Sequence, residues 1–292
     1  MYYLVFGWLY LFSLLPLRVL YLFSDLAYFL LYHVIGYRKK VVLQNLTVAF
    51  HHKTEKEKEA IAKEFYRNLC DTFIESIKFI SASKAFIMRR FTGDYSVVDA
   101  LYDTGRSVQI HLGHNFNWEL ANFAVPLSIR FKTLVVYLPL HSKVFNRLFL
   151  YIRSRFGSHL IAATNMKEEM QPYWGTQYLF ALIADQSPAN PKNAYWVNFF
   201  GRPTAFLRGP EKSARRNNWP VVFSHFIKQK RGFYKGFAHL ATLHPRELPE
   251  GELTKLYVHY LEKVMTANPE MWLWSHRRWK HEWKEEYGPV IV

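Results

Sequence analysis

A histidine and a carboxylate lie five positions apart in the segment Ile110–Glu119, which reads Ile-His-Leu-Gly-His-Asn-Phe-Asn-Trp-Glu. An imidazole can accept a proton from a hydroxyl group near neutral pH. A carboxylate that accepts a hydrogen bond from one ring nitrogen leaves the other nitrogen free as a base. On one continuous helix His114 and Glu119 would lie about 140° apart around the axis. They can meet only if His114 lies in a turn and Glu119 lies in the first turn of the next helix.

The residues around this segment favour that arrangement. Val108–His111 is an apolar run typical of a buried strand, and Asn117–Ala124 has the pattern of a helix. Asn117 is a good N-cap because its side chain can accept a hydrogen bond from a backbone N–H of the first turn. Glu119 would then stay ionised near the positive end of the helix dipole. We therefore predict that His114 is a base oriented by Glu119, without a protein nucleophile.

The rest of the chain predicts the elements that must position this segment. Strands are expected at Lys132–Leu138, Leu160–Ala162, Tyr178–Ala184 and Pro220–Ile227, and helices at Thr54–Ser81, Lys143–Arg155, Glu211–Asn217 and Leu253–Ala267. Alternating strands and helices predict an α/β fold with a mostly parallel central sheet flanked by helices. In such a sheet ligands bind at the carboxyl ends of strands, which is where the histidine lies.

The first 36 residues are strongly apolar. Met1–Pro16 carries no charged side chain, and Arg18 and Asp25 interrupt a largely apolar run that reaches Gly36. A membrane-spanning helix needs about 20 predominantly apolar residues, a length that Met1–Phe23 approaches, as does Val19–Ile35. No basic stretch precedes the run and no small-residue cleavage site follows it, which argues against a signal peptide.

We therefore expect two parts, a membrane-associated helical anchor over residues 1–36 and a catalytic domain over residues 37–292. The alternative is a buried helical hairpin inside a soluble fold. Tyr37-Arg38-Lys39-Lys40 follows the anchor. Basic residues flank the cytoplasmic side of membrane segments, so the catalytic domain is expected to face the cytoplasm.

The excess of basic residues limits the classes of binding partner to be expected. The chain has 38 basic and 23 acidic residues, a net charge of +15. Nucleic acid, anionic lipid headgroups and acidic proteins are the usual partners of such a chain, and no nucleic-acid-binding motif is found. The single cysteine, Cys70, excludes an internal disulfide and is expected to be a small buried side chain. Leu112 follows His111 where a zinc peptidase has Glu, so we predict no metal site, and His111 is expected to pack near the site.

Further elements follow in a set order behind the apolar anchor. They are Asn45-Leu46, the His-x4-acid pair of His114 and Glu119, Asp185-Gln186 after a strand, Phe199-Phe200-Gly201 before a helix start at Gly209, and the basic tryptophan-rich stretch Trp272–Lys280. Together they resemble the bacterial lipid A biosynthesis (late) acyltransferase family of the lysophospholipid-acyltransferase superfamily, over nearly the whole chain.

The sequence also departs from that family. His-Asn-Phe-Asn-Trp-Glu stands where the family often has His-Phe-Gly-Asn-Trp-Glu, and Leu138-Pro139 stands where an Arg-Pro pair is common, which leaves one phosphate or carrier contact unmatched. The Glu-Gly-Thr-Arg element of the glycerophosphate branch is not found. This weighs against a glycerophosphate acceptor.

The resemblance implies transfer of a fatty acyl chain from a thioester, on acyl carrier protein or coenzyme A, to a hydroxyl of a lipid A precursor or a related glycolipid or aminolipid. The resemblance also implies that the reaction needs no cofactor and that the protein lies at the inner membrane. We expect His114, Glu119 and Arg155 to be catalytic, with Arg155 and backbone N–H groups near Asn115–Asn117 stabilising the oxyanion. The residues expected to bind substrate are Asn117, Asp185, Gln186 and Arg277.

Two other functions are compatible with parts of the sequence. A non-enzymatic peripheral membrane scaffold would explain the charge and the anchor. It gives no reason for His114 and Glu119 to share a strand-to-helix turn. An acyltransferase that acts on amines would need the same base, and the residues alone do not separate amine from hydroxyl acceptors.

Overall fold

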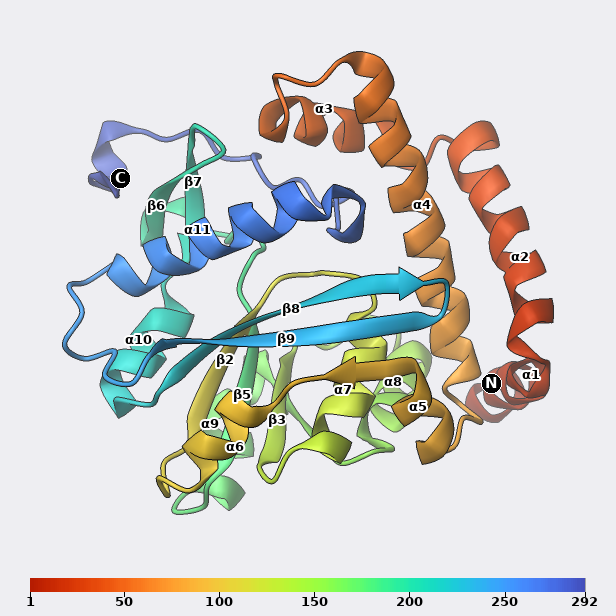
Figure 1. Cartoon of the computed structure of the whole chain (residues 1–292), viewed down its shortest axis with the longest axis horizontal. Coiled ribbons are helices and arrows are strands. Elements are labelled where there is room, and N and C mark those ends of the chain that lie inside the picture. Colours follow the sequence, from red (N-terminus) through yellow and green to blue (C-terminus); the bar gives the residue numbers. More distant parts are fainter. Residues whose placement is uncertain (292) are drawn as a thin grey trace.

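A computed structural model describes residues 1–291, and its centre is a seven-stranded sheet (Figure 1). The strands lie in the order β1-β9-β8-β2-β5-β3-β4, and of their pairings in the described chain only β8 with β9 is antiparallel. The mostly parallel sheet is therefore confirmed. The strands are β1 (Phe91–Gly93), β2 (Val108–Leu112), β3 (Lys132–Tyr137), β4 (Ser158–Ala162), β5 (Tyr178–Ile183), β8 (Val221–Lys230) and β9 (Phe233–Thr242).

A second, three-stranded sheet was not expected from the sequence. It contains β6 (Ala194–Phe199), β7 (Arg202–Leu207) and β10 (Val290–Ile291). β6 and β7 form a hairpin whose turn residues, Phe200 and Gly201, have φ values of 51° and 74°. Positive φ at both central residues is the requirement of the tight hairpin turn that matches strand twist. The Phe-Phe-Gly element is thus the turn that closes this hairpin.

Helices flank the central sheet, as predicted. Helix α7 contacts β1, β3 and β4, whereas α11 contacts β6 and β8 (Figure 1). The longest helix, α4, begins after Thr54, whose side chain forms a capping box with Glu57. The helices after the N-terminal pair are α3 (Lys39–Ala49), α4 (Glu55–Lys78), α5 (Lys84–Arg90), α6 (Ser96–Tyr102), α7 (Trp118–Ser128), α8 (Lys143–Ser154), α9 (Met166–Met170), α10 (Gly209–Asn217) and α11 (Glu252–Ala267).

Short helical turns complete the described chain. A π-helical turn, η1 (Leu30–Val34), extends the second helix of the N-terminal pair. The 3-10 turns are η2 (Ala163–Asn165), η3 (Gln171–Tyr173), η4 (Pro191–Asn193), η5 (Pro269–Met271) and η6 (Glu285–Tyr287).

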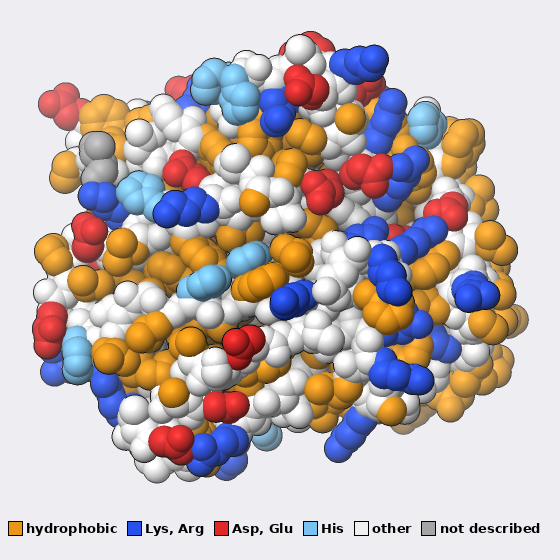
Figure 2. All heavy atoms as spheres, viewed as in Figure 1, with side chains coloured by type: hydrophobic (Ala, Val, Ile, Leu, Met, Phe, Trp, Pro, Cys, Tyr) orange, Lys and Arg blue, Asp and Glu red, His pale blue; other side chains and the backbone are white. Residues whose placement is uncertain are grey.

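The N-terminal segment forms two helices, α1 (Tyr2–Leu14) and α2 (Leu17–Phe29), which pack along α4. By length and composition alone, Leu17–Val34 could cross a membrane. Most large apolar side chains of the pair point outward, with Trp8 75% and Leu22 67% exposed. Figure 2 shows hydrophobic side chains along the edge formed by α2, with lysine and arginine side chains beside them. The pair is thus a packed hairpin with an exposed apolar face.

The main core lies between α4, α7, α11 and the sheet, and it is rich in aromatic side chains. Phe65, Phe116, Phe123 and Trp274 are among its fully buried members. Cys70 is buried within α4, as predicted, and burial raises the pKa of its thiol to about 12. This core fixes α4 and α7 against each other directly behind the turn that carries His114.

Candidate active site

His114 lies just beyond the carboxyl end of β2, and Asp185 lies just beyond the carboxyl end of β5. These strands are parallel neighbours, and the Ala184 N–H donates to the Leu112 carbonyl at 3.0 Å, so the two turns emerge side by side. The His114 Nδ1 is 2.6 Å from Asp185 Oδ1, and the His114 backbone N–H donates to Oδ2 at 2.7 Å. Strand pairing therefore brings this histidine and this carboxylate together.

The Asp185 carboxylate is held ionised although it is only 1% exposed. Burial by itself raises its pKa. Attraction to His114, hydrogen bonds from the side chain and backbone of His114, and one from Trp272 outweigh burial and leave the pKa below its usual value. The Trp272 Nε1–H donates to Oδ2 at 2.6 Å. Because an ionised carboxylate only accepts, the proton of the neutral His114 ring lies at Nδ1, and Nε2 carries the lone pair.

The second ring nitrogen of His114, Nε2, lies beside a cavity. Gln186 Nε2 is 3.1 Å from His114 Nε2, and the Trp118 ring packs edge-on against the imidazole at 5.6 Å between centroids. Both Gln186 and Trp118 line a cavity of about 470 Å³. Its other lining residues are Leu31, Tyr37, Arg38, Leu69, Phe73, Leu273, Ser275 and His276. The arrangement thus places the His114 imidazole next to a largely apolar cavity that reaches the N-terminal segment.

Glu119 has a different partner from the one predicted. Its carboxylate accepts hydrogen bonds from Arg153, with Nε 2.9 Å from Oε2 and Nη2 bonded to Oε1, and from Trp118 Nε1 at 3.0 Å. Glu119 lies in the first turn of α7, as expected, but its side chain is directed to the end of α8. Among residues 1–291 the carboxylate bonded to His114 is that of Asp185. The predicted hydrogen bond between Glu119 and His114 is therefore wrong.

Asn117 is the N-cap of α7, as predicted. Its Oδ1 accepts from the Leu120 N–H at 3.0 Å, and its Nδ2 donates to Glu75 Oε2 at 2.8 Å. The side chain is fully buried and both of its ends are occupied. In the structure this side chain therefore has a structural role, capping α7 and contacting Glu75, and its contact with substrate stays a prediction.

Arg155 was predicted to donate to the oxyanion, but in the structure its guanidinium has other hydrogen-bond partners. Its guanidinium donates to the Phe79 carbonyl and, at 3.2 Å, to the Ala82 carbonyl. It thereby satisfies backbone acceptors just after α4. Two of the backbone donors predicted near the site are also used, since the Asn115 N–H donates to the Gly113 carbonyl and the Phe116 N–H to the Met271 carbonyl, at 2.8 Å each. Arg153, two residues before Arg155, is the arginine bonded to a predicted site residue.

The tryptophan-rich stretch after η5 supports the site from the other side. Asn45 Nδ2 donates to the carbonyls of Trp274 and His276, each at 2.7 Å, which fixes this stretch against α3. His276 Nε2 accepts from the Ser187 N–H at 3.1 Å, and burial lowers the pKa of His276 to about 4, so it is neutral. Arg277, predicted to contact substrate, is exposed. The contact of this stretch with Asp185 was not foreseen.

A buried carboxylate that the sequence reasoning missed lies behind the site. Glu75 of α4 accepts hydrogen bonds from Asn117, from the Tyr21 hydroxyl at 2.7 Å and from the Tyr234 hydroxyl at 3.0 Å. Burial is the main cause that raises its pKa. It connects α2, β9 and the cap of α7. The signal in the sequence was a second acidic residue one turn after Asp71 on the buried face of a long helix.

His111 is buried in the sheet beneath the site. Its Nε2 is 2.6 Å from Gln109 Nε2, and burial lowers its pKa to about 3, so the ring is neutral. It stacks on Phe223 at 5.9 Å. This agrees with the packing role expected for His111.

The fold and the site together define a class of protein. A histidine with an aspartate partner, at the strand ends of an α/β sheet beside an apolar cavity, can activate a bound hydroxyl for group transfer. The family model of the bacterial lipid A biosynthesis acyltransferases matches residues 1–281, so the chain belongs to that family. The protein is accordingly an acyltransferase of lipid A biosynthesis. A search of curated proteins gave no match.

Proposed function

We propose that the protein transfers a fatty acyl chain from a thioester to a hydroxyl of a lipid A precursor or a related glycolipid or aminolipid. The observation that carries the proposal is the 2.6 Å contact of His114 with the buried Asp185, next to the 470 Å³ cavity. That contact keeps the ring proton at Nδ1 and leaves the lone pair of His114 Nε2, which faces the Gln186 amide nitrogen at 3.1 Å, to accept the hydroxyl proton. Family membership supplies the acyl chemistry.

The reaction can be written on these residues. His114 Nε2 takes the acceptor's hydroxyl proton as the oxygen attacks the thioester carbonyl carbon. The new C–O bond forms, the C–S bond breaks, and the imidazolium returns its proton to the departing sulfur. Asp185 stabilises the imidazolium. General base catalysis of this kind contributes roughly 10²–10⁴-fold.

Gln186 and Glu119 have separate parts in this proposal. The Gln186 side-chain amide lies on the Nε2 side of His114 and is our candidate donor to the oxyanion or to the acceptor hydroxyl. Glu119 is bonded to Arg153 and Trp118, so it holds the first turn of α7 against α8. Through Trp118 this pair fixes one wall of the site, and Glu119 acts by positioning.

The cavity suits the acyl chain. Leu31, Leu69, Phe73 and Leu273 line it, and each methylene they remove from water stabilises the bound chain by about 0.8 kcal/mol. Arg38, at the same cavity, is exposed, and so are Lys40 and Arg277. An acidic carrier protein is the donor that this charge favours, with the phosphates of coenzyme A as the alternative.

We propose that residues 1–36 anchor the chain in the inner membrane, with the catalytic domain of residues 37–292 in the cytoplasm. The exposed apolar face of α1 and α2 supports the anchor. Arg38, Lys39 and Lys40 directly after it support the orientation. The lipid acceptor would then reach the cavity from the membrane side.

Lipid mass spectrometry tests whether the protein is an acyltransferase that depends on His114 and Asp185. Cells with the wild-type chain are compared with cells carrying His114→Ala, Asp185→Asn or His259→Ala, the last being an exposed histidine of α11 and the matched control. One lipid should lose a single acyl mass in the first two variants and remain intact in the control. Release of the chain by mild alkali identifies an ester and argues against an amide. An unchanged lipid profile in both site variants, with the proteins stable in the membrane, would favour a scaffold.

A further inference from the structure

The catalytic domain carries an apolar surface of its own next to α1. Outside residues 1–37, the described chain has eleven exposed large hydrophobic side chains, and four of them fall between residues 138 and 151. They are Leu138, Leu140, Phe145 and Tyr151, on the loop after β3 and on α8. Leu138 is 69% and Phe145 49% exposed. Such a concentration marks an interaction site.

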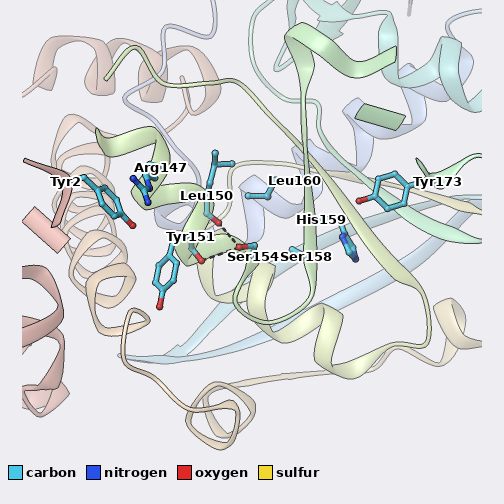
Figure 3. Close-up of a pocket in the computed structure, with 9 residues that line it drawn as sticks. All are labelled: Tyr2, Arg147, Leu150, Tyr151, Ser154, Ser158, His159, Leu160 and Tyr173. Atoms are coloured by element: carbon cyan, nitrogen blue, oxygen red, sulfur yellow. Dashed lines mark hydrogen bonds between the residues drawn. The ribbon is translucent and has the colours of Figure 1, made fainter. Parts of the chain in front are cut away.

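This surface is continuous with the exposed face of α1. The Arg147 guanidinium lies 4.2 Å from the Tyr2 ring centroid and 5.4 Å from that of Tyr3. The Tyr151 ring meets the Phe6 ring edge-on, at 5.1 Å between centroids. Figure 3 shows Tyr2, Arg147 and Tyr151 together at one end of a second cavity. The outward sides of α1 and α8 therefore form one surface.

The first part of the N-terminal segment and the region around α8 both carry basic residues and no acidic ones. Residues 1–24 and residues 120–167 contain no aspartate or glutamate, and Lys143 and Arg147 are exposed on α8. Arg147 and His159 line the second cavity, of about 460 Å³, together with Ser154 and Tyr173. Cationic and hydroxyl donors beside apolar and aromatic side chains are the chemistry that a lipid phosphate and its acyl chains require.

We propose that residues 138–151 form a second membrane-contact surface that lies on the bilayer beside α1, with Arg147 against an anionic lipid headgroup. The inference rests on the proposed anchoring by residues 1–36 and extends it to the catalytic domain. A bilayer is favoured over an acidic carrier protein as the partner of this surface. The carrier must dock where its thioester reaches His114, and none of the residues that line the cavity beside His114 lies within residues 138–151. Two contacts would fix the tilt of the catalytic domain on the membrane.

Site-specific fluorescence on the full chain tests this. The one native cysteine, Cys70, is 2% exposed, so a cysteine introduced at Phe145 can be labelled selectively with an environment-sensitive dye. Trp8→Cys reports the anchor. Leu243→Cys is the matched control, since Leu243 is an exposed hydrophobic residue (40%) between β9 and α11. The labelled chains are reconstituted in phosphatidylethanolamine–phosphatidylglycerol vesicles that contain nitroxide lipids.

We expect the nitroxide lipids to quench the labels at positions 8 and 145 several-fold more than the label at position 243. Quenching at position 8 but not at 145 would overturn the second contact while the anchor stands. Quenching at neither position would also remove the anchor. A spectral change at position 145 on addition of acyl carrier protein in detergent, without vesicles, would assign the surface to the donor and overturn the proposal.

The headgroup contact has its own test. Replacing phosphatidylglycerol by phosphatidylcholine should reduce quenching at position 145, and Arg147→Gln should abolish this difference between the two lipids. Arg216→Gln on α10 removes the same charge from an exposed position on another helix and should leave the difference intact. A difference that survives Arg147→Gln would overturn the role of Arg147.

Discussion

Asp185 Oδ1 lies 2.6 Å from His114 Nδ1 although 71 residues separate the two along the chain. The second carboxylate oxygen accepts from the backbone N–H of the same histidine, so both oxygens are used to hold one residue. Trp272 adds a third donor from the C-terminal region. The imidazole therefore has its tautomer and its direction set by groups that are buried and charged or strongly polar.

Asp185→Asn should lower kcat by roughly 10²–10⁴-fold with little change in KM. The amide keeps the shape but loses the charge that stabilises the imidazolium, and it can present a donor to Nδ1. Initial rates with an acyl thioester and a lipid acceptor measure the effect. Asp103→Asn, at an exposed pair with Arg130, is the control. A kcat within threefold of wild type would contradict the assignment of Asp185.

Trp272→Phe should lower kcat by about 10–100-fold while the chain stays folded. The substitution keeps an aromatic ring but removes one hydrogen bond to a charged group, worth about 1.5–3 kcal/mol. Trp274→Phe is the matched control, because the Trp274 indole Nε1–H donates to the neutral Pro269 carbonyl. Equal losses of activity in the two variants would mean that the ring matters and the hydrogen bond to Asp185 does not.

Glu119→Ala should reduce both activity and stability, and the additional loss in Glu119→Ala/Arg153→Ala should be small. Removing Glu119 leaves the Arg153 charge partly buried without its partner. Breaking a fully buried pair costs roughly 3–5 kcal/mol, and the cost here should be lower because Arg153 is 26% exposed. Urea unfolding of the wild-type chain, the two single variants and the double variant gives the coupling free energy between Glu119 and Arg153. Additive losses would show that the pair does not act as a unit.

Glu75→Gln should gain stability relative to wild type as the pH rises. Burial raises the pKa of Glu75 in the folded chain, so its stabilising contribution is complete below the ordinary value of 4.5. It is lost as the pH rises through the folded value, at no more than about 1.4 kcal/mol per pH unit. Glutamine has no such loss. Denaturation of the wild-type and Glu75→Gln chains from pH 4 to pH 8 measures the difference between their free energies of unfolding. A difference that stays constant with pH would contradict the raised pKa of Glu75.

Local patterns determined much of this protein. The start of α4 at Thr54, the Asn117 cap of α7 and the apolar run of β2 each depend on residues within a few positions, and all three were predicted. The same holds for β3, β4, β5 and β8 and for the helices α8, α10 and α11. These elements sufficed for the α/β class, and the ordered motifs from Asn45-Leu46 to Trp272–Lys280 together sufficed for the family.

Contacts between distant residues were decided by the tertiary structure. The sequence offered His114 a nearby acid, Glu119, but the pairing of β2 with β5 places Asp185 against the ring and leaves Glu119 to Arg153. The hairpin of β6 and β7 was also missed. A hydrogen bond requires two atoms within about 3 Å, and for residues far apart in the chain that distance depends on strand order and packing, which local periodicity does not encode.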